Sequence, residues 1–349
     1  MTQSTTTHKS PFSAFLERVL PSIEHAVAQS LPKAADDAHA SDLEQYLYEP
    51  LARLVRAGGK RIRPALCLLG STAVGGQAED ALSTACAVEL FQAAALIHDD
   101  IADQSELRRG LPCLHISEGT GIAINAGDMG VIDVVAQVMR DRGLSADVRL
   151  RLFDELYAME RRTLEGQALD LGWVRDGRWD LREEDYLAMA TLKTAHYSAA
   201  SPLVLGAICG KGTQEQVAAL RAFGLAAGLA FQIQDDLLNL VGDAEKQGKD
   251  FRSDVTEGKR TLVMVRALRQ LGEADAAELQ SILSSHSAND DARARAVELA
   301  EEAGAITYAQ AYAQSLADEA KRHVNDAPIT DEAREILLSM ADFFVSRAS

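Results

Sequence analysis

The amino-acid sequence predicts an all-α protein, and three observations support this fold class. The residue pattern is helical almost throughout, aromatic residues make up only 5% of the chain, and alternation of β-branched with polar residues is nearly absent. No internal repeat, low-complexity block or interdomain linker divides the 349 residues. We therefore expect a single domain of long helices over residues 11–349.

The expected helices have recognisable starts and ends. Small polar residues that favour a helix start stand at Ser41 and Asp42, at Ser145, and at Thr330 and Asp331. Glycines that favour a helix end follow several of the periodic segments, so the chain divides into helices joined by short turns. These glycines are Gly58, Gly59, Gly75, Gly76, Gly143, Gly210 and Gly212.

The first ten residues differ from the rest of the chain. Residues 1–10 are polar and rich in threonine, which predicts a disordered tail, and they lack the apolar segment of a signal peptide. No uninterrupted apolar run reaches the roughly 18 to 20 residues that a bilayer-spanning helix needs. We expect a soluble cytoplasmic protein without a transmembrane segment.

Charge and cysteine content narrow the functional classes. The formal net charge is −17, from 52 acidic and 35 basic residues, which argues against binding of a nucleic-acid backbone. The cysteines show no CxxC pair and no zinc spacing, so they are interpreted as small core residues in a reducing cytoplasm. They are Cys67, Cys86, Cys113 and Cys209.

A first aspartate cluster, HDDIADQSELRRG at residues 98–110, ends a long apolar helix that is expected to begin near Glu79. Asp99 and Asp103 are four residues apart and share a helix face, and Asp100 stands beside them. Adjacent carboxylates repel, so an apolar helix ending in them indicates a bound cation. Mg²⁺ fits because it takes oxygen ligands and bridges carboxylates to substrate phosphates.

A second cluster, FQIQDDLLNL at residues 231–240, repeats this spacing. Asp235 and Asn239 are four residues apart, Asp236 is adjacent, and the preceding segment is again apolar. One such cluster taken alone is equally compatible with a solvated helix end. Two clusters that each follow a long apolar segment predict a cleft with facing carboxylate walls, which is a site for several Mg²⁺ ions.

Basic residues gather in a few short segments. The turn at residues 58–64, GGKRIRP, places Lys60 and Arg63 at a helix start after two glycines, which suits a diphosphate bound without metal. A surface turn with incidental charges is the alternative. Arg108 and Arg109 follow the first aspartates and can face two different anions, since neighbouring side chains point in different directions.

Three further sites add positive charge. Lys193 is expected with Thr194 at the end of another helix, and Lys249 and Lys259 lie in the segment after the second cluster. Each lysine alone is typical of a solvated surface. Together with the arginines they indicate a pocket for two anionic substrates, one bridged by metal and one held by lysine and arginine.

These segments resemble the trans-isoprenyl diphosphate synthases, which comprise farnesyl, geranylgeranyl and polyprenyl diphosphate synthases. The resemblance spans about residues 40–349, in the family's order and spacing. It implies the isoprenoid synthase fold, a bundle of long helices around a deep central cavity, usually as a homodimer. The segments that carry it are GGKRIRP, HDDIADQSELRRG, GQALDL at 166–171, KTAHYS at 193–198, FQIQDDLLN and GKDFRSDVTEGKRTL at 248–262.

The resemblance also implies roles for individual residues. The isopentenyl diphosphate ligands are Gly59 through its backbone, Lys60, Arg63, Gln92 and Arg109. The allylic diphosphate ligands are Arg108, Lys193, Thr194, Gln232 and Lys249, with Lys259 in the closing loop. The magnesium ligands, for about three ions per active site, are Asp99, Asp103, Asp170 and Asp235, supported by Asp100, Asp236 and Gln167.

Two positions depart from the commonest family pattern. Gln104 stands where an acidic residue often follows the first motif, and Asn239 closes the second cluster in place of aspartate. Because an amide oxygen carries no net charge, any metal contact at Asn239 is expected to be weaker. The family tolerates asparagine there, so this change does not indicate a loss of activity.

The mechanism implied by the resemblance is ionisation, condensation and elimination. The allylic diphosphate leaves with the help of magnesium, in a cavity that excludes competing water. The alkene of isopentenyl diphosphate attacks the carbocation, and a proton passes to the departing diphosphate, since the sequence offers no obvious general base. Positioning and electrostatic stabilisation are expected to supply most of the catalysis, with Asp99, Asp100, Asp103, Asp235, Asp236 and Lys193 as its main residues.

Product length is predicted from the helix that carries the first cluster. Ala94 and Ala95 leave a route open along that helix, and Phe91 lies eight residues before Asp99, about 12 Å along the axis. Phe91 can therefore form the floor of the chain cavity, although it can instead pack against a neighbouring helix. We expect geranylgeranyl diphosphate, with farnesyl or a longer polyprenyl diphosphate as the alternatives.

Two other functions fit parts of the sequence. A class I terpene cyclase also uses two metal motifs in an α fold, but it binds one diphosphate and has no use for GGKRIRP. A non-catalytic synthase subunit usually loses one aspartate cluster or the arginine pair, and this chain keeps both. Incorporation of labelled isopentenyl diphosphate by the purified chain alone distinguishes the synthase from both.

Overall fold

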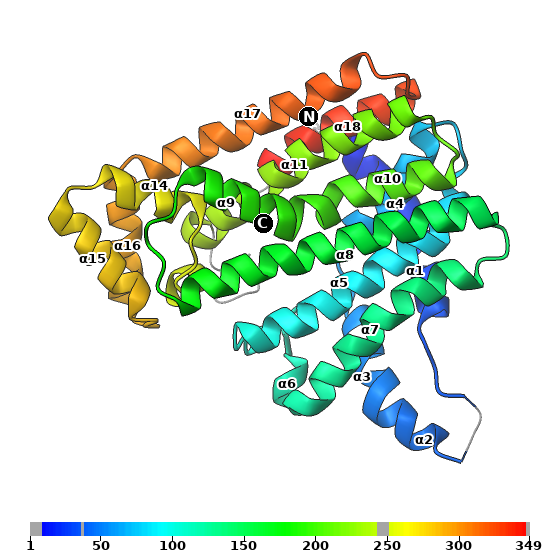
Figure 1. Ribbon diagram of the computed structural model, residues 1–349, viewed down its shortest axis with the longest axis horizontal. Helices are drawn as coiled ribbons and strands as arrows, with labels where there is room; N and C mark the ends of the chain where they lie inside the picture. Colours follow the sequence, from blue (N-terminus) through cyan, green and yellow to red (C-terminus); the bar gives the residue numbers. More distant parts are fainter. Residues whose placement is uncertain (1–8, 36–37, 243–250, 347–349) are drawn as a thin grey trace, which may run out of the picture.

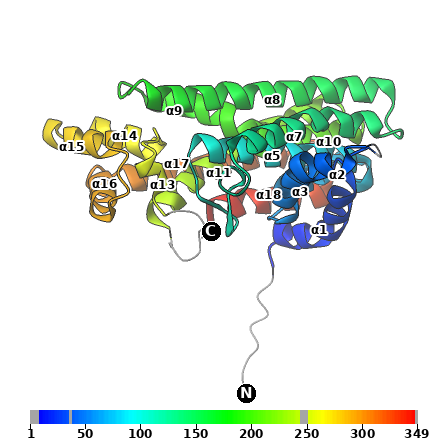
Figure 2. The same ribbon diagram turned by 90° about the horizontal axis from the view of Figure 1, so that it is seen from below.

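A computed structural model describes residues 9–35, 38–242 and 251–346, and the chain in these ranges is almost entirely helical (Figures 1 and 2). The exception is a short hairpin in which β1 (Leu107–Arg108) pairs antiparallel with β2 (Leu111–Pro112). The sequence pattern gives no sign of this hairpin, because two residues are too few for an alternating pattern. The predicted N-terminal tail lies outside the described residues except for its last two positions.

The chain begins with helices that carry the basic turn and the first aspartate cluster. They are α1 (Pro11–Ser30), α2 (Ala40–Leu43), the π-helical turn η1 (Glu44–Tyr48), α3 (Glu49–Arg56), α4 (Ile62–Ala73), the 3₁₀ turn η2 (Ala78–Ala81) and α5 (Leu82–Ala102). After the hairpin come α6 (Leu114–Ser117), α7 (Thr120–Arg140) and α8 (Ala146–Arg175).

The second half of the chain carries the second aspartate cluster and the helices at one end of the molecule. Its elements are α9 (Glu183–Ala190), η3 (Thr191–Ala200), α10 (Ser201–Cys209), α11 (Gln214–Val241), α13 (Ser253–Thr256), α14 (Leu262–Gln270), α15 (Glu273–Ser284), α16 (Asp290–Glu302), α17 (Ala305–Asn325) and α18 (Asp331–Ser346).

The predicted helix boundaries agree with these elements to within a few residues. Ser145 caps α8, because its hydroxyl accepts a hydrogen bond from the Val148 N–H at 3.4 Å. Helix α18 begins at Asp331, and the start predicted at Ser41 and Asp42 lies just inside α2. The helices α3, α4, α7 and α10 end shortly before the predicted glycines.

The expectation that Lys193 and Thr194 end a helix is wrong. They lie inside a continuous helical rod made of α9, η3 and α10, in the segment η3 (Thr191–Ala200) that has π-helical hydrogen bonding. No glycine or proline interrupts η3, so the rod continues where the sequence-based interpretation ended it. A π-helical segment widens the backbone locally and is frequent at functional sites.

Two clusters of buried apolar side chains fill the molecule. The larger is built mainly from α1, α4, α5, α7, α8, α10 and α18, and the smaller from the green helices α9 and α11 and the yellow to orange helices α14–α17 of Figure 1. Helix α11 contributes to both, with Phe223 in the larger cluster and Leu237 in the smaller. Helix α11, which carries the second aspartate cluster, is therefore packed into the apolar core along most of its length.

Helix α8 passes very close to η3, and a glycine makes this possible. A Cβ atom added to Gly166 would stand only 2.2 Å from the backbone nitrogen of Lys193. Since any side chain at this position would force the two helices apart, Gly166 explains the first residue of the GQALDL segment. The close approach also brings Asp170, one turn further along α8, next to the Lys193 side chain.

Three described helical segments are long and apolar enough to cross a membrane, by length and composition only. They are Ala78–Ala102, Thr120–Arg140 and Gln214–Val241. In the folded chain 72% of the most apolar window is buried in the first, against 44% in the second and 50% in the third. The apolar character of the first segment is thus largely used in packing against other helices.

Candidate active site

The two aspartate clusters and the basic turn lie around one cavity of about 460 Å³. Its walls come from α4, α5, α8, α9, η3, α11, α13 and the segment before α14. Most residues singled out from the sequence line it, namely Lys60, Arg63, Gln92, Asp99, Asp170, Lys193, Thr194, Gln232, Asp235, Asp236, Asn239 and Lys259. Lys249 lies outside the described residues.

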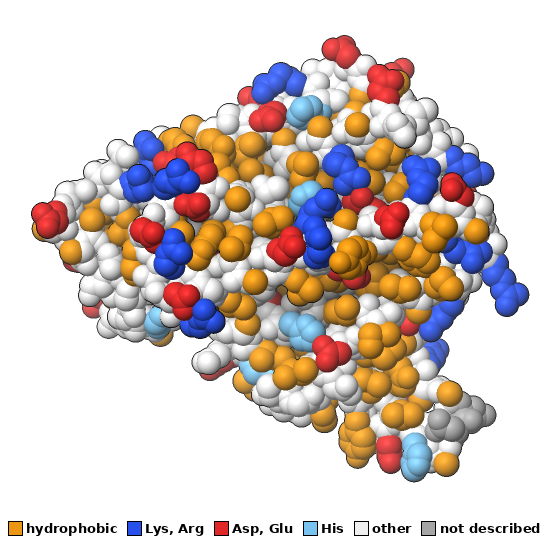
Figure 3. Space-filling model, in the orientation of Figure 1, with side chains coloured by type: hydrophobic (Ala, Val, Ile, Leu, Met, Phe, Trp, Pro, Cys, Tyr) orange, Lys and Arg blue, Asp and Glu red, His pale blue; other side chains and the backbone are white. Residues whose placement is uncertain are grey.

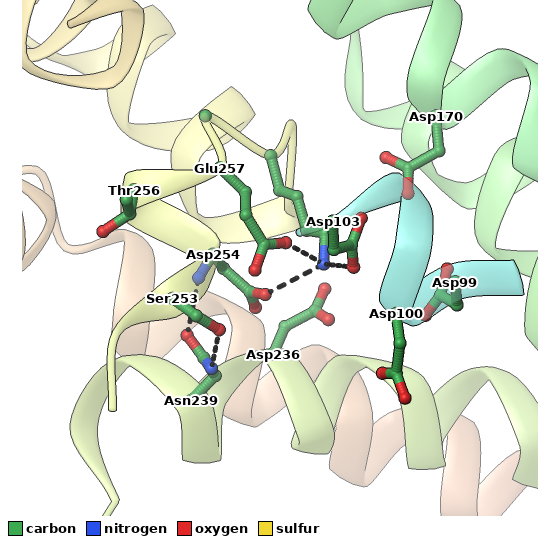
Figure 4. A network of polar contacts seen from close by, with 12 residues as sticks. Asp99, Asp100, Asp103, Asp170, Asp236, Asn239, Ser253, Asp254, Thr256 and Glu257 are labelled. Atoms are coloured by element: carbon green, nitrogen blue, oxygen red, sulfur yellow. Dashed lines mark hydrogen bonds and ion pairs between the residues drawn. The ribbon is translucent and has the colours of Figure 1, made fainter. Parts of the chain in front are cut away.

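The carboxylates of the first cluster point in two directions (Figure 4). Asp99 lines the cavity and accepts a hydrogen bond from the Gln167 side-chain amide at 2.9 Å. Asp103 faces Lys259, whose Nζ lies 3.2 Å from its Oδ2. Burial raises the pKa of Asp103, and the Lys259 ammonium opposes that rise.

The middle carboxylate of the first cluster, Asp100, points away from Asp103 (Figure 4) and pairs with Arg108. The Arg108 Nε lies 2.8 Å from Asp100 Oδ1, and its Nη2 also donates to that oxygen. Both side chains are buried, and together they border a small separate pocket instead of the main cavity. The structure therefore makes Asp100 and Arg108 partners of each other.

The second cluster holds its middle carboxylate with neutral donors. Asp236 accepts one hydrogen bond from the Tyr186 hydroxyl at 2.7 Å and one from the Gln232 amide at 2.6 Å. Burial, followed by the nearby Asp254 carboxylate, raises the pKa of Asp236 to about 8. Asp236 is therefore protonated more readily than an ordinary aspartate.

Both polar atoms of the Asn239 amide make hydrogen bonds within the protein. Its amide nitrogen donates to the Ser253 hydroxyl at 3.1 Å, and its carbonyl oxygen accepts from the Asp254 N–H at 3.1 Å (Figure 4). These two bonds hold the start of α13 against α11 and aim Asp254 at the cavity. Asn239 thus acts as a cap for α13 in this structure.

Two lysines sit among the carboxylates. Lys193 Nζ lies 2.5 Å from Asp170 Oδ2, and Lys259 Nζ contacts Asp103, Asp254 at 3.4 Å and Glu257. Burial alone lowers the pKa of a lysine, but these carboxylates more than offset that effect and raise both values. Both ammonium groups are therefore charged and placed to neutralise anions.

The opposite side of the cavity is basic. Arg63 donates to the Tyr197 hydroxyl at 3.0 Å and to the Ser198 hydroxyl at 2.8 Å. Arg109 packs on the turn, because a Cβ at Gly59 would stand 3.1 Å from one of its nitrogens. Burial and the neighbouring arginines lower the pKa of Arg109, which marks a cluster of like charges that an anion would relieve.

Comparison with known proteins identifies the family. The family model for polyprenyl synthetase matches residues 44–300. This chain belongs to the polyprenyl synthetase family. It is 40% identical over 325 residues to a short chain isoprenyl diphosphate synthase of Methanothermobacter thermautotrophicus, a match that covers 92% of this chain and 98% of that relative.

Two further matches show how this polyprenyl synthetase relates to synthases named for different products. A geranylfarnesyl diphosphate synthase of Natronomonas pharaonis is 34% identical over 342 residues, or 93% of this chain and 95% of that relative. The crystal structure of a geranylgeranyl pyrophosphate synthase from Corynebacterium glutamicum, complexed with isoprenyl diphosphate and magnesium, has a TM-score of 0.85 at 30% identity, covering 96% of this chain and 99% of that one. The predicted all-α isoprenoid synthase fold and the prenyltransferase class are thereby confirmed.

The polyprenyl synthetase has a second, apolar cavity of about 200 Å³ that shares Leu96, Asp99, Lys193 and Tyr197 with the main one. Phe91 lines this cavity, and its ring meets Tyr197 edge-on with 6.0 Å between centroids.

The two predicted alanines differ in their surroundings. Ala95 is on the cavity face with Phe91 and Asp99, as the helix spacing predicts. Ala94 is fully buried and packs toward α7, where a Cβ at Gly130 would approach it to 3.0 Å. Among the described residues, the wall of the apolar cavity includes Ala95 but not Ala94.

The donor set of the main cavity fits magnesium. Among the described residues, no three histidine, cysteine or acidic side chains converge on one point. The carboxylates stand on separate walls instead, Asp99 on α5, Asp170 on α8 and Asp235 on α11. Mg²⁺ keeps several waters and commonly takes one or two carboxylates together with substrate phosphates, so oxygen donors spread around a phosphate-sized space suit it.

Sequence reasoning missed several residues of this polyprenyl synthetase site. Tyr186 and Asp254 line the cavity and control Asp236, and Glu257 contacts Lys259. Asp254 and Glu257 belong to the segment GKDFRSDVTEGKRTL, so their acidic character was a usable signal. Tyr186 carried no signal, because a tyrosine in an amphipathic helix is usually a core residue.

Proposed function

We propose that this isoprenyl diphosphate synthase is a short-chain enzyme that condenses isopentenyl diphosphate head-to-tail with an allylic diphosphate to give geranylgeranyl diphosphate. The observation that carries the proposal is one cavity lined both by carboxylates and by a separate basic turn, with an apolar cavity that adjoins it at Asp99 and Lys193. A terpene cyclase would have no use for the second anion site. The proposed domain covers residues 11–349, since α1 and α18 pack together beyond the matched range.

Magnesium is the proposed cofactor, with about three ions per active site. Asp99, Asp103, Asp170 and Asp235 would hold it, and Gln167 supports them by orienting Asp99. When bound, magnesium neutralises the allylic diphosphate and helps it leave. Asp236 keeps its place beside Asp235 through its two neutral donors.

The two substrates are assigned to the two sides of the cavity. Gly59, Lys60, Arg63, Gln92 and Arg109 are proposed to bind isopentenyl diphosphate by direct charge-assisted hydrogen bonds. A buried Gln92 side-chain oxygen has no hydrogen-bond partner among the described residues, which supports a ligand there. The allylic diphosphate is assigned to Lys193, Thr194, Gln232 and Lys259, with Lys249 and Arg108 retained from the family resemblance.

The reaction follows from this placement. Lys193 and Lys259 hold positive charge beside the bond that breaks, which stabilises the leaving diphosphate. The apolar extension beside Leu96 shields the allylic carbocation from water while the alkene of isopentenyl diphosphate attacks it. The proton lost in the elimination passes to the departing diphosphate, and the protein contributes chiefly position and charge.

The apolar cavity is proposed to control product length. Phe91 is proposed as its floor, because the ring is held edge-on by Tyr197 and lies on the same face of α5 as Asp99. The small side chain of Ala95 leaves the route from Asp99 to Phe91 open. The similarity to a synthase named for geranylgeranyl diphosphate supports this length, and the similarity to one named for geranylfarnesyl diphosphate makes one more isoprene unit the alternative.

A homodimer is proposed as the working assembly, in the cytoplasm and without membrane or nucleic-acid partners. Its interface is assigned to the apolar face of α7 and α8, which Figure 3 shows as hydrophobic side chains along these helices. Leu150, Tyr157 and Leu164 recur every seven residues on α8 and are each about two-thirds exposed, as is Ile132 on α7. Such an exposed stripe is typical of an interaction surface.

Product analysis tests the reaction and the floor together. Purified protein with Mg²⁺, labelled isopentenyl diphosphate and each allylic starter should give a twenty-carbon product. Phe91→Ala should lengthen the product, and Ala95→Phe, one turn closer to the aspartates, should shorten it. A wild-type product of another length that neither substitution changes would reject the floor, and no elongation with any starter would reject the synthase assignment.

Sedimentation velocity tests the assembly. The wild type should sediment as a dimer, and Leu150→Glu combined with Tyr157→Glu should sediment as a monomer. Leu43→Glu, at an exposed leucine on α2, is the matched control and should remain dimeric. A dimer that survives the double substitution would place the interface elsewhere.

A further inference from the structure

Arg61 lies in the middle of the basic turn and has an unusual backbone conformation. It is the N-cap residue of α4 with φ 46° and ψ 33°, in the left-handed region. For a residue with a side chain this conformation is strained, and glycine would adopt it freely. A long charged side chain at such a position therefore needs a reason in its contacts.

The Arg61 side chain is saturated with hydrogen bonds inside the protein. Its guanidinium binds Glu24 in a two-pronged manner, through Nε at 2.8 Å and Nη2 at 3.2 Å. Nη1 donates to Glu89, and Nη2 also donates to the Val55 carbonyl at 2.7 Å. The side chain is only 1% exposed, so these contacts are held away from water.

These bonds connect the turn to three helices. Glu24 lies on α1, Val55 on α3 and Glu89 on α5. Helix α5 is the one that carries Gln92 and the first aspartate cluster further along. Arg61 therefore fixes the turn relative to the helix that forms one wall of the main cavity.

The charges around Arg61 show that it does not itself serve as an anion ligand. Burial lowers its pKa, but the carboxylates of Glu24 and Glu89 more than offset this and leave the pKa raised. Its charge is matched by two carboxylates, and neither is among the described residues that line the cavity. The described residues that line the cavity include its neighbours Lys60 and Arg63 but not Arg61.

We propose that Arg61 is a positioning residue for the isopentenyl diphosphate site. It locks the turn so that the Gly59 backbone, Lys60 and Arg63 face the same anion as Arg109, which packs against Gly59. This inference rests on the proposed function, because it concerns the site assigned to isopentenyl diphosphate. Arginine is required because lysine, with one point of charge, cannot bind Glu24 with two prongs and reach Glu89 as well.

Steady-state kinetics of Arg61→Lys test the proposal. The KM for isopentenyl diphosphate should rise about tenfold to a hundredfold, since small misplacement of binding groups has effects of this size. The KM for the allylic diphosphate should stay close to that of the wild type, while the melting temperature should fall by a few degrees, because the buried Glu89 carboxylate loses its partner. Arg56→Lys, which alters an exposed ion pair with Glu49 on the neighbouring α3, is the matched control and should change neither constant.

Glu24→Gln keeps the proposal testable if Arg61→Lys does not fold. Glu24 is partly exposed on α1, so its loss is easier to accommodate, and the variant should raise the KM for isopentenyl diphosphate in the same direction by a smaller factor. The double variant should show less than the product of the two single effects, because both act through one contact.

The outcomes separate this inference from the proposed function. Equal changes in both KM values, or a lower melting temperature with unchanged constants, would assign Arg61 to general stability and overturn the inference. If the wild type elongates no allylic diphosphate with isopentenyl diphosphate, the proposed function fails. If it elongates normally and both variants keep the wild-type KM, the proposed function stands and the role of Arg61 is rejected.

Discussion

The two aspartate clusters have almost the same sequence spacing but different electrostatic surroundings. In the first, Asp100 is paired with the Arg108 guanidinium and Asp103 with the Lys259 ammonium. These two carboxylates are therefore compensated by cations of the protein itself. Asp100 and Asp103 are thus held in place without a ligand. A metal ion that bound Asp103 would replace its contact with Lys259.

The second cluster is compensated differently. Among the described residues, Asp236 accepts hydrogen bonds from two neutral donors, Tyr186 and Gln232. Burial, followed by the nearby Asp254 carboxylate, raises its pKa to about 8. A buried carboxyl that is held by neutral donors gains more from a nearby cation than one that is already paired with a cation of the protein. The comparison shows that two clusters of nearly the same spacing hold their middle carboxylates differently, Asp100 through an arginine and Asp236 through neutral donors.

The largest effect is expected when either wall loses its cavity-facing carboxylate. Asp99→Asn and Asp235→Asn should each lower kcat/KM by about a thousandfold, or roughly 4 kcal/mol, because each replaces a charged carboxylate of the proposed metal site with a neutral amide. Asp154→Asn, an exposed position on α8, is the control and should keep full activity. If one of the two variants stayed within tenfold of the wild type, that wall would not hold metal.

The next largest effect is expected on stability, and it concerns the buried ion pair that only the first cluster has among the described residues. Arg108→Met leaves Asp100 buried without a counter-charge and should lower the free energy of unfolding by about 3–5 kcal/mol. Urea denaturation with and without Mg²⁺ measures the effect. Arg53→Met breaks a partly exposed pair with Glu118 and should cost less than about 1 kcal/mol. Equal losses in the two variants would contradict a prepared, buried ion pair in the first wall.

Much of the site was predictable because its parts are close together in the sequence. Asp99, Asp103 and Phe91 lie on one helix, so helix geometry alone puts Asp99 and Phe91 on a shared face. The same holds for Asp235 and Asp236 on α11. The all-α fold also followed from periodicity and from capping residues such as Ser145.

The parts that were not predictable depend on contacts between distant residues. Tyr186 binds Asp236 across 50 positions, and Arg61 binds Glu24 across 37. Helix periodicity cannot specify which residues meet when separate helices pack. Lys193 was misplaced at a helix end for a related reason, since the π-helical hydrogen bonding of η3 leaves no mark in the residue pattern.

A smaller effect is expected from Tyr186→Phe, which removes a neutral donor from the second wall. The variant should lose about 1–2 kcal/mol of stability. The Tyr186 hydroxyl lowers the pKa of Asp236, so its loss should raise that pKa further above 8. Magnesium must compete with this proton, and its affinity should therefore fall by about tenfold to a hundredfold at pH 7 and recover toward the wild-type value at pH 9.

The raised pKa of Asp236 should also show in the pH dependence of stability without metal. A carboxyl whose pKa is raised on folding keeps its proton between about pH 4 and 8, where the unfolded chain has lost it. In the presence of chelator, the free energy of unfolding should therefore decrease as the pH rises through this window. Asp236→Asn should remove that slope, and an unchanged slope would show that Asp236 is not the group responsible.

The smallest effect is expected at the position where the two motifs differ in sequence. Asn239 uses both atoms of its amide to hold Ser253 and the Asp254 backbone, and a carboxylate can accept a hydrogen bond from each of them. Asn239→Asp should therefore keep kcat/KM and magnesium affinity within about threefold of the wild type, or roughly 0.6 kcal/mol. Asn239→Leu removes the cap and should cost about 1 kcal/mol of stability. A tenfold gain in magnesium affinity for Asn239→Asp would instead make position 239 a metal contact, and the two walls would then be more alike than their present surroundings indicate.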